Sequence, residues 1–422
     1  MRRNSWRGAF FPLLILVLFL TACAGEIGPA GPAGPPGPQG IPGPTGRDGA
    51  AGSPGPAGVD GLSYQPPAFI GADACAECHQ EIYDRYRYSG HAWQLTPVIN
   101  GESPDYPWSS VPNPPAGYTW DDISYIVGGY QWKALFLDQD GYIITGNEAQ
   151  YNLANRRLGQ RDEWVAFHTG ETRSYDCGGC HTTGYSPEGH QDGREGIVGT
   201  WTEPGISCEE CHGPGSLHAS NPLTMRLAVG SSAAVCSDCH MRNAGVTLTA
   251  TDGFIQHHDE YIDLFPGKHA VIDCVTCHDP HDGVNQLRET KEATTRATCQ
   301  NCHYQEAQVQ NVGRHARLGV DCIDCHMPRL IETAEGDAAF FSGDVRTHLT
   351  AIDPNLIGQF TENGEVIPQL GLEYVCRSCH VEGGNAPAWT DEELQAAAKG
   401  YHTPRPTTEP ETTTETATQP TP

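Results

Sequence analysis

The stretches CGGCH, residues 177–181, and CEECH, residues 208–212, are two copies of the five-residue pattern that decides how this chain folds. The pattern Cys-x-x-Cys-His occurs eight times between residues 75 and 380. Its two cysteines are three positions apart, so one helical turn brings both sulfur atoms to the same face. A histidine follows directly in every copy, which predicts that all eight copies bind the same group.

This pattern is the attachment motif of c-type haem. Two thiols add to the vinyl groups of the porphyrin, and the imidazole of the next residue ligates the iron. We therefore expect eight covalently bound haems as cofactors. The predicted attachment residues are Cys75, Cys78, Cys177, Cys180, Cys208, Cys211, Cys236, Cys239, Cys274, Cys277, Cys299, Cys302, Cys322, Cys325, Cys376 and Cys379. The predicted proximal iron ligands are His79, His181, His212, His240, His278, His303, His326 and His380.

Zinc sites and disulfides are the alternative explanations for paired cysteines. Zinc sites use Cys-x-x-Cys pairs, but they do not require a histidine after every pair. The motifs use sixteen of the seventeen cysteines, which leaves no pair for a structural disulfide. Both alternatives therefore explain the repeated pattern less well than haem does.

The second axial ligand of each iron is expected to be another histidine. Methionine is scarce, with four residues in the chain, whereas eleven histidines lie outside the motifs. Bis-histidine ligation implies lower reduction potentials than His/Met ligation. The predicted distal ligands are His91, His168, His218, one of the adjacent His257 and His258, His269, His281, His315 and His348. His190 and His402 are interpreted as surface or loop residues, and the sequence does not indicate which histidine faces which motif.

The N-terminus predicts export. Arginines at positions 2, 3 and 7 precede an apolar run that ends at Leu20 and is too short to span a bilayer. The following LTAC, residues 20–23, resembles a bacterial lipobox, which implies a signal peptide over 1–22 and a lipid on Cys23. An ordinary signal peptide is the alternative. The expected location is the outer face of a cell membrane, in the periplasm or at the cell surface.

Residues 23–63 are expected to form a lipid-anchored collagen-like stalk. Glycine occupies every third position from Gly25 to Gly61, with nine prolines among the triplets. Only glycine fits at the axis of a collagen triple helix, so a homotrimeric stalk is one interpretation. A single-chain, polyproline-like spacer is the other.

The remaining chain is expected to form an octahaem domain over 64–402 and a disordered Thr/Pro-rich tail over 403–422. The domain's expected fold class is mainly α, with extensive irregular loops and a small β-hairpin, built around the haems. Residues 131–146 predict that hairpin, with Asp140-Gly141 at its turn. Short helices are expected within 79–92, 295–309 and 390–401.

The charge of the chain limits its partners. The formal net charge is −27, with 52 Asp and Glu against 25 Lys and Arg. Such a surface argues against nucleic acid as a partner. It is compatible with redox partner proteins that carry basic surfaces, or with an extracellular electron acceptor.

Several stretches resemble a group of multihaem c-type cytochromes. The group includes the cytochrome c-554 type, octahaem tetrathionate and nitrite reductases, hydroxylamine oxidoreductase and periplasmic decahaem conduits. The similar stretches are CAECHQEIYDRYRYSGHA, CGGCHTTGY, GISCEECHGPGSLH, CVTCHDPH, RHARLGVDCIDCHMP and DVRTHLTAIDP, within residues 70–380. The resemblance implies closely packed haem pairs arranged in a chain. It also implies distal ligation by His91, His218, His281, His315 and His348.

Two functions remain open at this point. An electron carrier would transfer electrons along bis-histidine haems between a membrane donor and an extracytoplasmic acceptor. An oxidoreductase for nitrite, hydroxylamine or tetrathionate would need one iron with an open position. No catalytic constellation is evident, and Lys133 and Arg173 are interpreted as surface charges. An adhesive role for the stalk is conceivable only as an addition.

Overall fold

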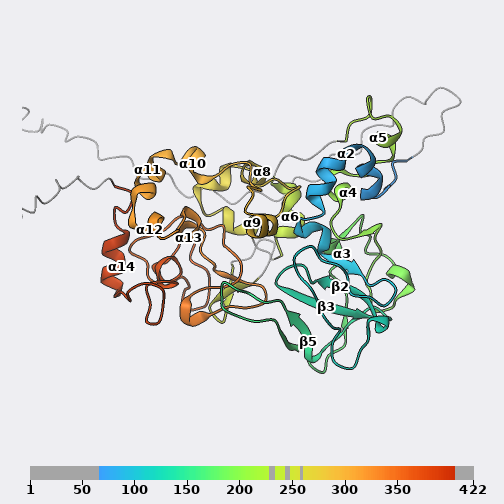
Figure 1. Ribbon diagram of the computed structural model, residues 1–422, viewed down its shortest axis with the longest axis horizontal. Helices are drawn as coiled ribbons and strands as arrows, with labels where there is room; N and C mark the ends of the chain where they lie inside the picture. The colour runs from blue at the N-terminus through green and yellow to red at the C-terminus, as the bar shows by residue number, and fades with distance from the viewer. Residues whose placement is uncertain (1–65, 228–232, 243–247, 257–259, 404–422) are drawn as a thin grey trace, which may run out of the picture. The chain divides into compact units, whose positions relative to one another are not determined.

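The computed structural model describes residues 66–227, 233–242, 248–256 and 260–403, shown as the coloured ribbon in Figure 1. The expectations for the signal peptide, the lipid on Cys23, the stalk and the tail beyond residue 403 lie outside the described residues. So do the expectations for His257 and His258. Among the described residues, no helix is long and apolar enough to cross a bilayer.

A seven-stranded antiparallel sheet dominates residues 95–174. Its strands are β1 Leu95–Pro97, β2 Ile123–Gly128, β3 Lys133–Asp138, β4 Tyr142–Ile143, β5 Gly146–Asn152, β6 Glu163–Phe167 and β7 Arg173–Ser174. They follow the order β1-β2-β3-β4-β7, and β5 pairs with β3 and β6. Figure 1 shows β2, β3 and β5 together, apart from helices α6, α8 and α10.

Both faces of this sheet are covered by side chains. In β3, Ala134 and Phe136 are fully buried in one apolar cluster, where the Phe136 and Trp164 rings are 5.5 Å apart. The next residue of β3, Leu137, is equally buried but belongs to a second cluster with Tyr175 and Trp201. Successive strand residues point to opposite faces, so a strand with two buried faces needs apolar residues on both.

The predicted hairpin is present, but it is part of a larger sheet than the sequence suggested. Leu137 of β3 pairs with Ile143 of β4, and Gly141 adopts a φ of 89° at the turn between them. A side chain at residue 141 would also meet the Ile197 side chain at 2.6 Å. The turn therefore requires glycine both for its positive φ and for lack of space. The expectation of one small hairpin was therefore too modest, because β1, β2, β5, β6 and β7 extend the sheet.

The motifs lie on short helices separated by loops, as expected. These are α2 Ala72–Tyr86, α3 Gly178–His181, α4 Cys208–His212, α6 Ala234–His240, α8 Cys274–Cys277, α10 Cys299–Cys302 and α13 Cys322–His326. The last motif begins within a π-helix, Glu373–Arg377. The other α-helices are α5 Ser216–Ser220, α7 Glu260–Leu264, α9 Val284–Thr290, α11 Tyr304–Val312, α12 Arg314–Arg317 and α14 Asp391–Ala398. The expected helices near 79–92, 295–309 and 390–401 correspond to α2, to α10 with α11, and to α14.

A third apolar cluster supports the C-terminal motifs. It joins Phe254 of β11 to Leu330, Ile331, Leu370 and Tyr374. Of these five residues, all except Tyr374 are less than 3% exposed. The small sheet here has the order β10-β11-β12, with strands Ala250–Thr251, Phe254–Gln256 and Ile331–Glu332. A further two-stranded sheet pairs β8 Thr182–Thr183 with β9 Glu203–Pro204, between the second and third motifs.

Candidate functional site

Each motif places its two sulfur atoms on one helical turn, and the local sequence favours that turn. In α10 and α13, the residue before the second cysteine bonds back to the backbone in front of the helix. Asn301 accepts a hydrogen bond from the N–H of Thr298 at 2.7 Å, and Asp324 accepts one from the N–H of Asp321 at 2.9 Å. This is the returning half of a capping box, which fixes the first turn of a helix too short to be stable alone. No disulfide joins the sixteen motif cysteines, all of which are described.

Among the described residues, seven of the eight motif histidines face a histidine from elsewhere in the chain. Within the described part of the chain, the ring contacts pair each of these histidines with one other histidine. The pairs are His79–His218, His91–His240, His212–His281, His269–His303, His278–His348, His315–His380 and His326–His402.

The distance between the paired rings is nearly constant, whereas their relative rotation is not. The seven centroid separations span 5.9 to 6.3 Å, and the angles between ring planes span 20° to 85°. Two metal–nitrogen bonds of about 2.0 Å, plus the offset from nitrogen to ring centre on each side, give a separation of roughly 6.3 Å. A metal between two imidazoles fixes this separation but leaves rotation about the N–metal–N axis free. Direct ring stacking would restrict the angle as well.

In seven of the fourteen paired rings, Nδ1 is hydrogen-bonded to a group other than the facing histidine. Nδ1 of His218 lies 2.6 Å from the carbonyl of Met225, and Nδ1 of His326 lies 2.8 Å from the carbonyl of Thr350. Further Nδ1 contacts join His240 to Glu260, His269 to Thr350, His281 to Asp279, His315 to Tyr401 and His380 to Pro387. Metal-ligating histidines use their second nitrogen in this way, which fixes the tautomer and leaves Nε2 to bind the metal.

Burial keeps several of these rings in the form that binds metals. It lowers the pKa of His91 to about 4, with a further contribution from His240. It also lowers the pKa of His348 to about 4, again with repulsion from the paired histidine, His278. Neutral imidazole is the ligating form, so neither ring has to lose a proton at neutral pH to bind iron. The pKa of His240 is raised instead, mainly by its hydrogen bond with Glu260.

Three predicted distal ligands lie elsewhere or outside the described residues. His168 has a φ of 41°, packs edge-on against Phe167 and lies 3.2 Å from a carboxylate oxygen of Glu171. His257 and His258 lie outside the described residues. The remaining motif histidine, His181, places its Nδ1 3.2 Å from the carbonyl of Gln94.

His402 is a residue that the sequence interpretation set aside. Its ring lies 5.9 Å from that of His326, with 25° between the planes. It follows α14 and Tyr401, whose hydroxyl contacts His315 of another pair at 2.7 Å. Its position next to a Thr/Pro-rich tail led to its interpretation as a surface residue. No signal in the local sequence indicated that it faces a motif. His190, also set aside, is exposed and bonds the carbonyl of Ile197.

Cysteines of different motifs lie next to one another, which reveals how the motifs are ordered in space. The first motif contacts the third through Cys75 and Cys208, and α2 packs on α4. The sulfur atoms here stand in for the thioethers of the haem-bound protein. Cys236 likewise bonds Cys274, and Cys299 bonds Cys322. After the larger effect of burial, Cys302 raises the pKa of Cys277 and Cys376 raises the pKa of Cys325, so these motifs are also neighbours. From the fourth motif to the eighth, spatial order therefore follows sequence order.

The second motif departs from that order. Its Cys180 contacts Cys239 of the fourth motif, and α3 packs on α6. The other cysteine of the fourth motif is Cys236. It bonds Cys274 of the fifth motif, and the charge of Cys211 of the third motif contributes to raising its pKa. The fourth motif therefore contacts the second and fifth motifs and lies near the third, so the second motif is a side branch at this point.

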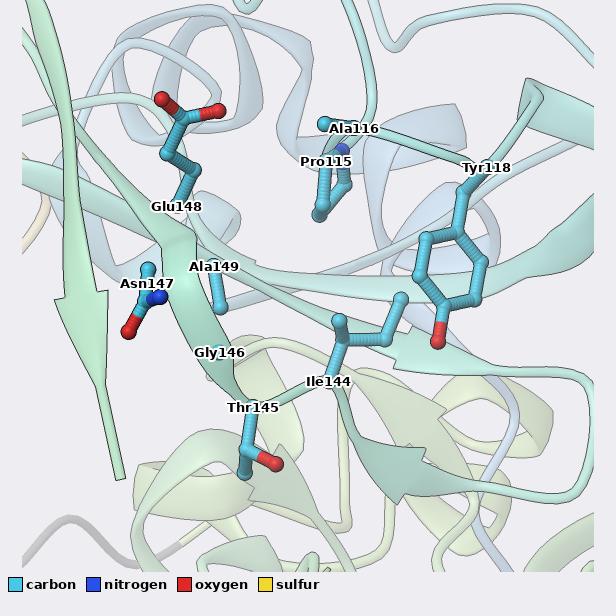
Figure 2. A pocket seen from close by; sticks show the side chains of 9 residues that line it. All are labelled: Pro115, Ala116, Tyr118, Ile144, Thr145, Gly146, Asn147, Glu148 and Ala149. Atoms are coloured by element: carbon cyan, nitrogen blue, oxygen red, sulfur yellow. The ribbon is translucent and has the colours of Figure 1, made fainter. Parts of the chain in front are cut away.

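These residues fit c-type haem. Each motif presents two sulfur atoms and a histidine on one turn, and seven motifs have a second imidazole at the separation that a hexacoordinate iron needs. A cavity of about 400 Å³ lies on the sheet, away from the motifs. Tyr118 and Ile144 approach each other across it, and Glu148 lies opposite (Figure 2). None of its lining residues belongs to a motif.

Comparison with known protein families supports the haem assignment. A family described as "Doubled CXXCH motif" matches residues 268–308, and one described as "Cytochrome c554 and c-prime" matches residues 148–213. The chain thus resembles multihaem c-type cytochromes, as predicted, and carries several CXXCH haem-attachment motifs.

Two curated relatives are also multihaem proteins. The dissimilatory sulfite reductase MccA of Wolinella succinogenes is 22% identical, and the match covers 80% of this chain. The chain spans 64% of the length of that relative, which is less than two thirds. The multihaem cytochrome MtrA of Shewanella baltica is 25% identical over 29% of this chain and 36% of its own length.

Two solved structures share the fold. The octahaem sulfite reductase MccA of Wolinella succinogenes matches 80% of this chain and 72% of its own, with a TM-score of 0.55 and 17% identity. The outer cell wall cytochrome OcwA matches 78% of this chain and 86% of its own, with a TM-score of 0.51 and 18% identity. At these identities the likeness concerns the fold alone, which is that of a multihaem cytochrome.

Proposed function

We propose that this chain is an exported, lipid-anchored octahaem c-type cytochrome that relays electrons between a membrane donor and an extracytoplasmic acceptor. One observation carries the proposal: seven histidine pairs among the described residues keep one ring separation while their ring rotations vary widely. The chemistry that a haem supplies when bound between two such imidazoles is reversible one-electron transfer. The named resemblance to MtrA and OcwA supports a role in electron transfer.

The residue roles follow from the pairs. Each of the sixteen motif cysteines attaches a haem, and the eight motif histidines are proximal ligands. We assign His91, His218, His269, His281, His315, His348 and His402 as distal ligands. This replaces the earlier expectation for His402. The position of His168 beside Glu171 speaks against it as a ligand, and His257 and His258 stay candidates for the second motif.

The contacts between motifs support a relay rather than eight isolated sites. Neighbouring cysteines join the attachment points into one connected series from the first motif to the eighth, with the second as a branch. The series ends at the first and eighth motifs. Electrons exchanged at these ends or at the branch would reach redox partner proteins or an extracellular acceptor.

Electron paramagnetic resonance of the oxidised, haem-loaded chain tests this function. We expect eight haems by pyridine haemochrome assay and low-spin signals alone. Pairs with small angles between ring planes, such as His79–His218 at 20°, should give rhombic signals. Nearly perpendicular pairs, such as His269–His303 at 85°, should give strongly anisotropic ones. Colourless protein without a Soret band would overturn the proposal.

A second candidate function is reduction or oxidation of a small nitrogen or sulfur compound at one open haem position. The sulfite reductase activity named for MccA and the cations near the second motif favour it. Arg242 lowers the pKa of His181 after the larger effect of burial, and it also acts on Lys133. Cations near an open site would stabilise anions such as sulfite or nitrite. A high-spin signal that changes when sulfite is added would favour this candidate. The response to sulfite should then be lost in Arg242→Gln.

The anchor and stalk belong to the proposal and need their own tests. Metabolic labelling with palmitate should mark the wild-type chain and not Cys23→Ala. Sedimentation of the chain with and without residues 25–63 distinguishes a trimer from a single-chain spacer. A monomeric mass for the full chain would exclude the triple helix and leave the relay unaffected.

A further inference from the structure

Thr350 lies between histidines of two different motifs. Its hydroxyl oxygen is 3.1 Å from Nδ1 of His269, which faces His303 of the sixth motif. Its carbonyl oxygen is 2.8 Å from Nδ1 of His326, the histidine of the seventh motif. Ring nitrogens bonded in this way leave Nε2 of both rings for iron. One residue therefore holds a proposed ligand of the sixth haem and a proposed ligand of the seventh.

The backbone on both sides of Thr350 is fixed. Leu349 is 1% exposed and belongs to the third apolar cluster, and the carbonyl of Ala351 accepts a hydrogen bond from the N–H of Leu370 at 2.7 Å. The two oxygens of Thr350 therefore have set positions. Since only the hydroxyl belongs to the side chain, a substitution can remove the bond to His269 and leave the carbonyl in place.

Tyr401 forms a similar tie between the seventh and eighth motifs. Its hydroxyl lies 2.7 Å from Nδ1 of His315, which faces His380 of the eighth motif. The Tyr401 and His315 rings also stack, with 5.7 Å between their centroids. The next residue, His402, faces His326 of the seventh motif. Two adjacent residues after α14 therefore contact the histidine pairs of two motifs.

Gln310 sets the direction of the hydrogen bond at Tyr401. Its Nε2 donates to the carbonyl of Val320 at 2.8 Å, so the atom that lies 2.9 Å from the Tyr401 hydroxyl is the amide oxygen Oε1. This oxygen can only accept, so the phenol donates its proton to Gln310 and its own oxygen accepts from Nδ1–H of His315. His315 is thereby held in the tautomer whose Nε2 is available to iron.

We propose that Thr350 and Tyr401 are positioning residues, which fix the orientation of ligand rings and tie together the last three haems of the series. Binding to a metal leaves each imidazole free to rotate. The angles of 85° and 76° between the histidines of the sixth and eighth motifs and their partners therefore need another restraint. A hydrogen bond from Nδ1–H supplies that restraint. It also makes the imidazole more basic, which stabilises oxidised iron and lowers its reduction potential.

This inference rests on the proposed relay, and Thr350→Val in the haem-loaded full chain tests it. The variant keeps a branched side chain and loses the hydroxyl, so the reduction equilibrium constant of one haem should rise about threefold in a redox titration. The electron paramagnetic resonance signal of the same haem should change as the His269 ring rotates. Thr350→Ser keeps the hydroxyl and should retain both wild-type values. The matched control, Thr251→Val at an exposed position of β10, should change neither.

Tyr401→Phe tests the second tie. The variant keeps the ring and removes the hydroxyl, so it should give a rise of similar size in a different haem component. Gln310→Leu removes the acceptor of the phenolic proton. It should shift that component in the same direction and have no further effect in the Tyr401→Phe background. Tyr118→Phe, at a tyrosine that is 40% exposed beside the cavity on the sheet, should leave all components unchanged.

The outcomes separate this inference from the function on which it rests. Low-spin haems with wild-type signals and potentials in both Thr350→Val and Tyr401→Phe would overturn the inference alone. So would a shift in Thr350→Val that Thr350→Ser shares, because the hydroxyl would not be its cause. If Thr350→Val did not fold, Tyr401→Phe and its combination with Gln310→Leu would decide the matter. Loss of the haem spectrum in the wild-type chain would instead overturn the relay.

Discussion

The sheet of residues 95–174 and the motif segments of residues 234–326 are stabilised by different means. In the sheet, Ile126, Ala134 and Phe136 are fully buried against one another. In the motif segments, the helices that carry the motifs have four to seven residues, and apolar side chains such as Val271 and Leu318 are 81% and 69% exposed. Helices this short are not stable in water without outside packing. The comparison indicates that the sheet depends on its own side chains and the motif segments on their haems.

The strongest way to break this comparison is to withhold haem. In chain produced without haem attachment, we expect amides of α8, α10 and α13 to exchange at nearly the unfolded rate, because those helices lose the group they pack on. Amides of β2 and β3 should stay protected. Hydrogen exchange followed by mass spectrometry measures both in one sample. Equal protection of the sheet and the motif helices would show that haem is not what separates them.

Truncation within the sheet should act in the opposite sense. Phe136→Ala removes a ring that is 0% exposed, and a loss of about 3 kcal/mol or more in the free energy of unfolding of the sheet is expected. The matched control, Val271→Ala, alters a side chain that is 81% exposed and should change stability by less than about 0.5 kcal/mol. Denaturant unfolding monitored by tryptophan fluorescence, alongside the Soret band, compares the two. A larger effect of the control would contradict the assignment of the core.

The histidine pairs offer a local test. His402→Ala should convert one low-spin haem to high spin, because His326 would lose the ring that faces it at 5.9 Å. His190→Ala, at an exposed histidine bonded to the carbonyl of Ile197, should leave every haem signal unchanged. Electron paramagnetic resonance distinguishes the two variants. An unchanged spectrum for His402→Ala would return that residue to the surface role that its sequence position suggested.

The smallest expected effect is on pH dependence, where the sheet meets the C-terminal segment. Burial raises the pKa of Glu335 to about 6, and its Oε2 has no hydrogen-bond partner among the described residues. The folded state therefore holds a proton more tightly than the unfolded one, so this contribution to stability is complete below about pH 4.5 and is lost as pH rises through 6. Glu335→Gln should reduce the fall in the free energy of unfolding between pH 5 and 7 by roughly 1 kcal/mol, measured by denaturant unfolding at each pH. An unchanged slope would show that Glu335 ionises freely.

The motif residues were predictable because their chemistry is local. Two cysteines and a histidine within five positions specify one helical turn and one ligand without reference to the remaining chain. The hairpin at Gly141 was predictable for the same reason, since its turn depends on adjacent residues. Strands β1 and β7 were missed because they have only three and two residues, and β5 because it begins at a glycine, so none of them shows a long alternating pattern.

The partners of the motif histidines depend on tertiary structure and were predicted less well. His218 follows its own motif by six residues but faces His79, 139 positions earlier. Nothing in the local sequence distinguishes His402, which faces a motif, from His168, which pairs with Glu171. The number of spare histidines was informative, whereas their individual roles required the fold.

The carboxylate of Glu209 has a mechanical consequence. The described chain begins at residue 66, and by Gly71 its backbone is bonded to a side chain of α4 and, through Ala68, to Ser216. Any pulling force transmitted through residue 66 would therefore load these bonds before it reached α2. A tether attached before residue 66 would therefore act on these hydrogen bonds before it could unfold the first helix.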